Sequence, residues 1–518
     1  MPRLADTGIF RSNAWVAAFF LCFLILGLFL HRDYGACWDE KYTHSHGQQI
    51  WKFLFEGDPA LLTAHDRFYG PFIEAVLTFV THWIGTSTIR QDLFLRHAAV
   101  FVIFFIGTVC FYRLSVRRHG GRAAGLFSVL LLLLSPRIFA DAFYNSKDVG
   151  FLAVFIAAVL TMERALEKPS ASRLAVHAVV SAAAISTRLA GLLIPALTAF
   201  FLLVDMCRRT DRKIFTAVRN GLLYMVLVPL LTVAFWPTLW HDPIGGFVSA
   251  VREMGHFTKG PDGVLYRGEF VTTLDIPWHY LPTWIAITTP IFHLFCSAWG
   301  ICLMAARWAW GSDGLRRRSR EDITVLAWLI VPVLLVIFTG SPVYDGWRHF
   351  YFVYPAIVLL AVDGWMWVLN RLNGRALKSM WAAISAAAVL PILLFMVQSH
   401  PLQNVYFNLL AGPRETIAER YEVDYWGLSY REGLEYIARI DPRRSVLVSV
   451  SNPPGEINWH LASPWSETRR LRMIAQPGKA HYFLTNYREG PLHRKPPARM
   501  RKIREIKVGG VTVLGIYQ

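Results

Sequence analysis

Long apolar runs alternate with short polar segments from the N-terminus to about residue 397. A helix needs about 20 apolar residues to cross the hydrocarbon core of a bilayer. Runs that reach or approach this length predict eleven membrane-spanning helices, at residues 13–31, 94–112, 122–138, 149–165, 172–187, 189–206, 217–237, 284–306, 323–340, 349–369 and 379–397. The apolar stretch from Gly70 to Gly85 is shorter, which favours an interfacial or re-entrant helix over a span.

The pattern changes after residue 397. The remaining residues contain no long apolar run, and a helical pattern covers about residues 429–440. Short stretches typical of β-strands occur at residues 445–450, 482–485 and 511–517. We therefore expect a membrane module at 1–397 and a small α/β domain at 398–518, which at about 120 residues can bury a core of its own.

Composition supports a membrane protein. Hydrophobic residues make up 54% of the chain and charged residues only 17%, whereas soluble domains have about 45–50% and about 25%. A soluble protein, a disordered chain and a disulfide scaffold are therefore excluded. Five of the six cysteines lie in or beside apolar runs, so we expect no structural disulfide and no cysteine-based metal site.

The net charge of +17 is spread over short clusters between the apolar runs. If the N-terminus is inside, these clusters face the cytoplasm, as the positive-inside rule requires. The same topology places the C-terminal domain and four segments outside, namely residues 32–93, 139–148, 238–283 and 341–348. We expect membrane lipids as partners, and no nucleic acid; the basic stretch from Arg488 to Lys507 is expected to be a solvated or headgroup-facing surface.

The first outer segment opens with two adjacent carboxylates, Asp39 and Glu40, directly after Trp38. Desolvation at a membrane face raises the pKa of a carboxyl group toward the range of a general base. The alternative is an ordinary helix cap or a loop charge. His44 and His46 follow at a spacing of two, which does not place them on one helix face and does not favour a metal site.

Three outer segments each bring a cation to the same membrane face. Lys147 stands beside Asp148 at a helix entrance, where capping the helix is the alternative role. Arg188 lies between two spans, and Arg348 is followed by His349. An outward Arg without an acid nearby in sequence indicates an anion, and phosphate suits a guanidinium. A carboxylate base among cations is what sugar transfer from a lipid phosphate requires, because the base deprotonates the acceptor hydroxyl and the cations stabilise the departing phosphate.

These features resemble the GT-C glycosyltransferases, and within them the protein O-mannosyltransferases and the bacterial aminoarabinose and galacturonic acid transferases to lipid A. The resemblance covers about residues 10–400. It rests on Trp38-Asp39-Glu40, Ser135-Pro136, Asn145-Ser146-Lys147-Asp148, Arg188 and Asp345-Gly346-Trp347-Arg348-His349. It implies an all-α polytopic membrane protein with a GT-C-like fold, to which a small α/β extracytoplasmic domain is attached.

The resemblance further implies an inverting transferase with a polyprenyl-phosphate-linked sugar as donor. Asp39 is then the candidate catalytic base, and Glu40 and Asp148 are the other candidate catalytic carboxylates. The candidate substrate-binding residues are Lys147, Arg188 and Arg348, at the lipid phosphate, and Tyr344 and His349 beside them. A divalent metal is possible in this superfamily, but the sequence contains no ligand set with convincing spacing, so no metal site is assigned.

Other functions stay open. A lipid-linked glycan ligase or polymerase would use the same kind of donor. A transporter or flippase usually shows internal repeats and ionisable groups near the bilayer midplane, and an anchored assembly factor would explain the C-terminal domain but not the cations. The acceptor is a glycan, a lipid or a protein. The aromatic stretch Tyr421–Tyr430 is expected to stack on a sugar or to fill a core. Short basic loops fit a bacterial inner membrane, with the active site facing the periplasm.

Overall fold

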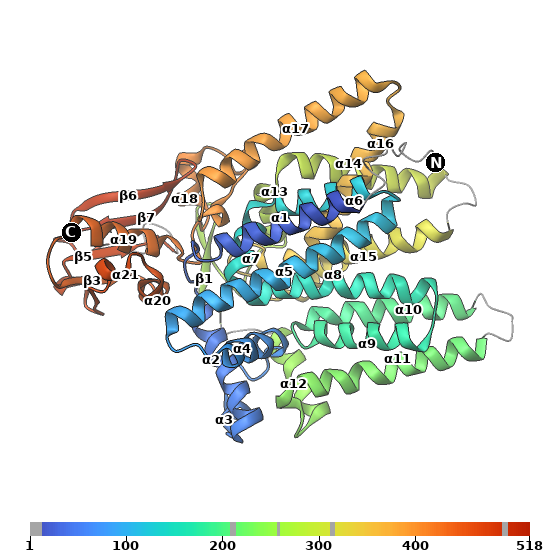
Figure 1. Ribbon diagram of the computed structural model, residues 1–518, viewed down its shortest axis with the longest axis horizontal. Coiled ribbons are helices and arrows are strands. Elements are labelled where there is room, and N and C mark those ends of the chain that lie inside the picture. The colour runs from blue at the N-terminus through green and yellow to red at the C-terminus, as the bar shows by residue number, and fades with distance from the viewer. Residues whose placement is uncertain (1–12, 208–213, 256–259, 311–315, 489–495) are drawn as a thin grey trace.

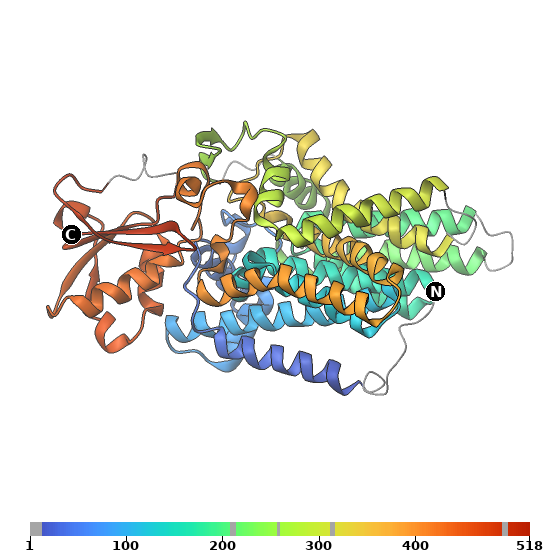
Figure 2. The ribbon, with the colours of Figure 1, turned by 90° about the horizontal axis from the view of Figure 1, so that it is seen from above.

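The computed structural model describes residues 13–207, 214–255, 260–310, 316–488 and 496–518. Long helices lie side by side in a bundle, and a domain with a β-sheet stands at one end of it (Figure 1, Figure 2). Residues 1–12, the predicted cytoplasmic N-terminus, lie outside the described residues. The described chain is therefore mostly helical, with its main sheet near the C-terminus.

All eleven predicted spans coincide with helices over most of their length, although the eighth, 284–306, crosses the break between α13 (Tyr280–Thr288) and α14 (Ile291–Trp310). In the described part of the chain, eight helical segments are long and apolar enough to cross a membrane. They are α5 (Ile89–His119), α8 (Ser146–Glu167), η3 (Leu189–Leu192) with α10 (Leu193–Cys207), α11 (Ile214–Phe235), α14 (Ile291–Trp310), α15 (Arg316–Thr339), η6 (Arg348–Val353) with α16 (Tyr354–Arg371), and α17 (Arg375–Gln398). Two further predicted spans are shorter helices, α1 (Ala14–Leu30) with 17 residues and α9 (Ala171–Ile185) with 15. The count of eleven stays a prediction.

The third predicted span is bent. α6 (Arg122–Leu133) and α7 (Pro136–Tyr144) meet at an angle of 76°. Pro136 has no backbone N–H and disfavours helical geometry in the residue before it, so the first helix ends there. The prediction of one continuous helix over residues 122–138 is therefore wrong. Every residue of α7 is buried, and the helix leads directly to the start of α8.

The segment between α1 and α5 folds into short helices against the bundle. α2 (Glu40–Trp51) continues into a π-helical turn, η2 (Lys52–Glu56), and is followed by α3 (Ala60–Thr63) and α4 (Phe72–Ile84). α4 has 13 residues, too few to cross a bilayer, and it packs on α2, α5 and α8. Its outer face exposes Phe79 and Trp83. The expected short interfacial helix between Gly70 and Gly85 thus has the length and the apolar face that this position requires.

A five-stranded sheet organises the C-terminal domain. Its strands are β3 (Val446–Val450), β4 (Leu471–Met473), β5 (Tyr482–Thr485), β6 (Lys502–Val508) and β7 (Val511–Tyr517), in the order β4-β3-β5-β7-β6. β3 is parallel to β4 and β5, whereas β7 is antiparallel to β5 and β6. The sequence predicted β3, β5 and β7, and it missed β4 and β6.

Short helices complete this domain and the third outer segment. They are α12 (Pro243–Gly255), α13 (Tyr280–Thr288), α18 (Ile417–Arg420), α19 (Ser429–Ile440), α20 (Pro454–Leu461) and α21 (Trp465–Thr468), with a hairpin of β1 (Gly263–Tyr266) and β2 (Glu269–Thr272) between the first two. α19 was predicted, and it lies directly on the sheet. A Cβ at Gly433 would stand 2.5 Å from a methyl of Leu514 and 2.6 Å from one of Leu484, so a larger residue there would have to displace these side chains.

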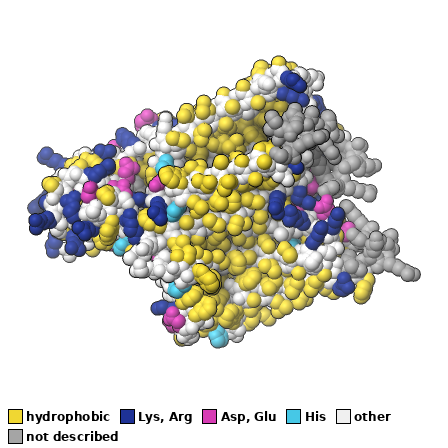
Figure 3. Space-filling model, viewed as in Figure 1, with side chains coloured by type: hydrophobic (Ala, Val, Ile, Leu, Met, Phe, Trp, Pro, Cys, Tyr) yellow, Lys and Arg dark blue, Asp and Glu magenta, His cyan; other side chains and the backbone are white. Residues whose placement is uncertain are grey.

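Apolar side chains cover the outside of the bundle. Figure 3 shows them as a broad belt over the helices, with Lys and Arg gathered at the end away from the sheet and over the C-terminal domain. Phe29, Phe338 and Val397 are 76%, 82% and 69% exposed. Patches of this size are unfavourable in water and are stable against lipid. The chain is therefore a multi-pass integral membrane protein.

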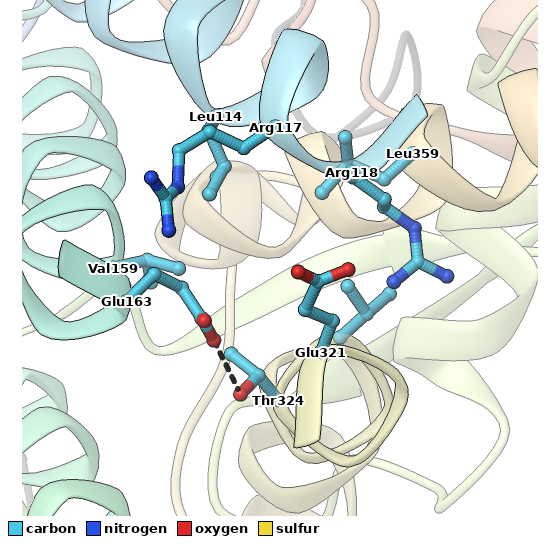
Figure 4. Close-up of a pocket in the computed structure, with 9 residues that line it drawn as sticks. Leu114, Arg117, Arg118, Val159, Glu163, Glu321, Thr324 and Leu359 are labelled. Carbon is cyan, nitrogen blue, oxygen red and sulfur yellow. Dashed lines mark hydrogen bonds between the residues drawn. The ribbon is translucent and has the colours of Figure 1, made fainter. Parts of the chain in front are cut away.

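The end of the bundle away from the sheet contains a buried network of ion pairs. Arg118 on α5 lies 2.7 Å from Asp322 on α15 and also pairs with Asp363 on α16. Nearby, Thr324 donates a hydrogen bond of 3.2 Å to Glu163 on α8. Figure 4 shows Arg118, Glu163 and Thr324 among the residues around a cavity of about 20 Å³, which has room for about one water. The network joins four helices at this end.

Loss of the Arg118 charge is expected to destabilise the bundle. The side chain is 4% exposed, so Arg118→Ala leaves Asp322 and Asp363 buried with less compensation. The expected cost is about 3–5 kcal/mol, measured by thermal unfolding in detergent. The matched control is Arg117→Ala, because this side chain is 24% exposed and its pair with Glu167 should contribute about 0–1 kcal/mol. Equal losses in both variants would contradict a structural role for the buried network.

Candidate active site

The candidate residues come from four segments that are far apart in the chain. Asp39 precedes α2, Lys147 and Asp148 lie in the first turn of α8, Arg188 precedes η3, and Arg348 begins η6. Ion pairs link these segments, so they meet at the end of the bundle that carries the C-terminal domain (Figure 1). The structure thus brings the predicted cations and Asp39 into one cluster.

Arg348 is the centre of this cluster. Its Nη1 lies 3.0 Å from Oδ2 of Asp148 and 3.3 Å from Oδ2 of Asp39. Its Nη2 lies 3.2 Å from Oδ2 of Asp345, and the guanidinium stands 4.5 Å from the ring centre of Trp426. The side chain is only 3% exposed. Because three carboxylates face it, its positive charge is compensated within the protein.

Asp148 is buried between two arginines. Its Oδ1 accepts a hydrogen bond from Nη2 of Arg188, and its Oδ2 accepts one from Arg348. Asn145 donates to Oδ2 of Asp148 over 2.9 Å, and its own side-chain oxygen accepts the backbone N–H of Asp148 over 3.0 Å. Asn145 is therefore the cap of α8. The carboxylate of Asp148 instead holds Arg188 and Arg348 together.

The two adjacent carboxylates of the first outer segment face different partners. The side chain of Asp39 is 23% exposed and pairs with Arg348. Glu40 is buried, where its Oε2 accepts the backbone N–H of Cys37 over 2.9 Å and its Oε1 lies 2.9 Å from Nε2 of His97 on α5. Glu40 therefore fixes the loop to α5, whereas Asp39 faces the cluster.

Two cations of the cluster keep part of their surface exposed. Lys147 is half-buried, and its Nζ lies 4.5 Å from the ring centre of Tyr69. Arg188 is 20% exposed and uses one terminal nitrogen for Asp148. Its Nε is buried and, within the part of the chain that the structure describes, has no hydrogen-bond partner. Both side chains therefore have N–H groups with which to bind an anion.

Aromatic side chains line the same region. The rings of Tyr344 and His349 pack edge to face at 4.9 Å, and the guanidinium of Arg348 lies 5.3 Å from the ring centre of Tyr344. Burial raises the pKa of Tyr344 to about 12. Burial also raises the pKa of Tyr69 well above its usual range. Both phenols stay protonated at neutral pH, so neither adds negative charge beside the exposed cations.

The C-terminal domain contributes two residues that the sequence analysis did not assign to the site. Nη2 of Arg488 lies 2.8 Å from Oδ1 of Asp345, and its guanidinium stands 4.3 Å from the ring centre of Trp38. Trp426 contacts Arg348 through its ring, and its Nε1 donates to Oδ2 of Asp141 over 3.3 Å. Asp345 was noted in its motif, but no role was given to it. The stretch Tyr421–Tyr430 is buried throughout, so its rings fill the interior between the domain and the bundle.

The accessible face of the cluster carries only part of its charge. Three arginines and three aspartates take part, namely Arg188, Arg348, Arg488, Asp39, Asp148 and Asp345, so their formal charges cancel. The side chains of Asp39 and Arg188 are 23% and 20% exposed, while the other four are 4% exposed or less. With Lys147, the exposed face therefore offers one carboxylate and two cations.

The cluster does not fit a metal site. Over the described ranges, no three His, Cys, Asp or Glu side chains are placed to hold a metal ion together. The carboxylates of Asp148 and Asp345 are already turned toward arginines.

The chain is similar to a known family over part of its length and to a known structure over almost all of it. A family model described as dolichyl-phosphate-mannose-protein mannosyltransferase matches residues 72–236. The fold is similar to that of ArnT from Cupriavidus metallidurans bound to undecaprenyl phosphate, with a TM-score of 0.50, 16% identity and coverage of 98% of each chain. The apo state of ArnT gives a TM-score of 0.50 at 15% identity, over 97% of this chain and 98% of that one.

The oligosaccharyltransferase of Archaeoglobus fulgidus in its apo form was also found, with a TM-score of 0.45 at 11% identity, over 90% of this chain and 66% of that chain. None of the curated proteins matches the sequence. The likeness to ArnT includes the membrane helices and the C-terminal domain alike, so it is a likeness of the whole fold.

Proposed function

We propose that this chain, a membrane glycosyltransferase with the GT-C fold, moves a sugar from a polyprenyl-phosphate-linked donor to a hydroxyl group of an acceptor and inverts the anomeric carbon. The observation that carries the proposal is the exposed face of the cluster, where the carboxylate of Asp39 stands with the cations Arg188 and Lys147. The crystal structure of the similar ArnT contains undecaprenyl phosphate, which supports a lipid phosphate of this type.

Asp39 acts as the general base. Its carboxylate takes the proton of the acceptor hydroxyl as that oxygen attacks the anomeric carbon of the donor. The bond from this carbon to the phosphate oxygen breaks, and polyprenyl phosphate leaves with the electron pair. Attack and departure occur on opposite faces of the sugar in one displacement, which inverts the configuration. Proton transfer to a positioned base contributes about 10²–10⁴-fold to such a rate.

Arg348 and Asp148 position this base and the cations. Arg348 faces three carboxylates, so phosphate binding there would have to displace at least one of them. We therefore assign the lipid phosphate to Lys147 and Arg188, and we assign the orientation of Asp39 to Arg348. Asp148 fixes the spacing of Arg188 and Arg348. Two preorganised cations stabilise the charge that develops on the departing phosphate.

A cavity beside the site suits the hydrocarbon chain of the donor. It has a volume of about 340 Å³ and is lined from α2, η2, α4, α11 and the turn η4 (Pro237–Leu239). Its walls are mostly apolar and aromatic, with Trp51, Phe55, Phe72, Phe79, Phe235 and Trp240 among them. Asp39 stands at the start of α2, and Tyr69, which Lys147 contacts, stands shortly before α4. The same two elements therefore connect the cavity to the site.

We also propose an orientation of the chain in the membrane. The bundle of residues 1–397 spans a bacterial inner membrane with the N-terminus in the cytoplasm, and residues 398–518 lie with the site in the periplasm. Support comes from the basic segments 113–122 and 316–320, which belong to the end of the bundle away from the site. The acceptor is a hydroxyl group of a glycan, lipid or protein in that compartment.

The phosphate assignment predicts weaker use of the donor when either exposed cation is removed. Lys147→Gln and Arg188→Gln each remove a charge-assisted contact of about 1.5–3 kcal/mol, so the KM for a polyprenyl-phosphate sugar should rise at least about tenfold. Steady-state kinetics of purified protein measure this change. Lys52→Gln is the control, because Lys52 is an exposed cation on a different segment, in η2 between α2 and α3. If both cluster variants keep the wild-type KM and bind donor normally, the assignment fails.

A further inference from the structure

One end of the C-terminal sheet gathers cations that the proposed reaction does not use. The N-terminal ends of the parallel strands β4, β3 and β5 lie side by side with the C-terminal end of α19. Together they carry a group that we name the arginine tip, consisting of Arg439, Arg443, Arg444, Arg469, Arg470, Arg472 and Lys479. The space-filling view in Figure 3 shows Lys and Arg side chains spread over the C-terminal domain.

The arginine tip faces away from the membrane helices. The opposite ends of the parallel strands point toward the bundle, since Asn486, directly after β5, donates over 2.8 Å to the backbone oxygen of Asp424, two residues before Trp426. The five residues of β3 at about 3.3 Å each separate the two ends of the sheet by roughly 15 Å. Arg444, Arg472 and Lys479, at or beside these ends of β3, β4 and β5, are therefore far from the headgroups of the membrane that holds the bundle.

The fold holds this end of the sheet rigidly. The guanidinium of Arg470 donates to the backbone oxygens of Ala438, Asp441 and Arg443 over 2.7, 2.9 and 2.7 Å. It thereby ties the end of α19 and the loop after it to the start of β4. Arg443 pairs with Asp441. The exposed cations between these anchors are thus carried on fixed backbone.

Most charges of the arginine tip are uncompensated. Arg439, Arg444, Arg469, Arg472 and Lys479 are exposed, and the described part of the structure gives none of them an ion pair. The other edge of the sheet is different, because Lys502 and Lys507 on β6 lie 2.5 and 3.4 Å from the shared Glu505. Arginine also offers a planar fork of donors that matches a carboxylate or a phosphate, which lysine does not.

An exposed tryptophan stands next to these arginines. Trp465 is 41% exposed, and its ring lies 5.2 Å from that of Trp459 and 5.9 Å from the guanidinium of Arg90 at the start of α5. Its backbone oxygen accepts the N–H of Arg469 over 3.0 Å, so the two residues are one helical turn apart and share a face. A flat aromatic face packs well on the apolar C–H face of a sugar ring, which an acidic peptide lacks. Fork-shaped cations beside such a ring favour a charged saccharide over other polyanions.

We propose that the arginine tip and Trp465 bind an acidic glycan, meaning a saccharide chain with carboxylate or phosphate groups, and that this glycan carries the acceptor. The role of this glycan as acceptor rests on the proposed transferase function, whereas its binding does not. Such a site would raise the local concentration of the acceptor at the outer domain and leave the chemistry to Asp39.

The test uses full-length protein in detergent and three dextrans of equal length, one unmodified, one carboxymethylated and one phosphorylated. Fluorescence anisotropy at about 150 mM salt should show binding of at least one charged dextran and none of the neutral one. R444Q/R469Q/R472Q should weaken that binding at least about tenfold. The control R501Q/K502Q/K507Q removes the same charge near the opposite edge and should change it less than about threefold.

Three outcomes would overturn the proposal: equal weakening by both triple variants, absence of binding to either charged dextran, or polyglutamate binding as tightly as the better charged dextran. Trp465→Ala should weaken dextran binding and spare polyglutamate. Donor turnover on a small soluble acceptor is measured in parallel and should be unchanged in R444Q/R469Q/R472Q. If binding fails while turnover persists, only the arginine tip loses its role. If binding persists without turnover, the transferase function fails instead.

Discussion

Asp39→Asn is expected to lower kcat by about 10²–10⁴-fold and to change the KM for the donor little. Asparagine keeps the shape of the side chain but does not accept a proton at neutral pH. Asp39 is 23% exposed, so the substitution leaves no buried carboxylate behind, and Arg348 keeps Asp148 and Asp345 as partners. Steady-state kinetics with separate variation of donor and acceptor concentrations measure the two parameters.

The control for this variant is Asp33→Asn. Asp33 lies six residues earlier in the same loop, is 46% exposed and pairs with His400 outside the cluster. It should keep wild-type kinetics. Full activity of Asp39→Asn would leave the reaction class intact but remove Asp39 as the base. A rise in KM without a fall in kcat would instead assign Asp39 to binding.

Removing Arg488 is expected to have the second large effect, because this residue connects the C-terminal domain to the site. Its partner Asp345 is 3% exposed, so Arg488→Gln leaves a buried carboxylate with less compensation. The expected loss of stability is about 3–5 kcal/mol, seen as a lower midpoint of thermal unfolding. Activity should fall as well, because Asp345 and Trp38 lie beside Arg348 and Asp39.

A double variant separates folding from positioning. Asp345→Asn combined with Arg488→Gln removes both charges of the pair, which often restores most of the stability. Arg348 then lacks one of its three carboxylates, so the orientation of Asp39 is less well defined. We expect kcat to stay at least about tenfold below wild type, since displacements of about 1 Å at a reacting group can cost about 10²-fold. Recovery of both stability and kcat would show that the Arg488 pair is purely structural.

The membrane part of the fold was predictable because bilayer thickness sets the length of a spanning helix. This argument located the long helices of the bundle, but it does not settle α1 and α9, whose 17 and 15 residues are near the limit. The bend between α6 and α7 was foreseeable from Pro136, since proline ends helices. β4 could not be predicted in the same way, because its three residues are too few to show the alternation of apolar and polar positions that marks a strand.

The members of the site were easier to predict than their partners. Charged residues at a membrane face are costly, so Asp39, Arg188 and Arg348 stood out in the sequence. Arg188 was expected to need an anion because no acid is near it in sequence, but Asp148 is its partner from 40 residues earlier. Arg348 pairs with Asp39 across 309 residues.

The contribution of the C-terminal domain had no counterpart in the sequence pattern. Arg488 is one of many cations in a basic region, and its contact with Asp345 spans 143 residues. Only the fold of the domain onto the bundle selects this arginine from the others. The aromatic density of Tyr421–Tyr430 did mark a special segment, but its burial against the bundle, with Trp426 on Arg348, follows from the tertiary structure.

Sugar transfer from a polyprenyl-phosphate donor is tested most directly by measuring the stoichiometry of the reaction. Purified protein is incubated with a panel of polyprenyl-phosphate sugars and an envelope extract as acceptor, and free polyprenyl phosphate and glycosylated product are quantified together. We predict equal molar amounts of both from one donor, lost in Asp39→Asn. Wild-type protein that binds the donors but releases no polyprenyl phosphate with any of them would contradict the account and favour lipid transport.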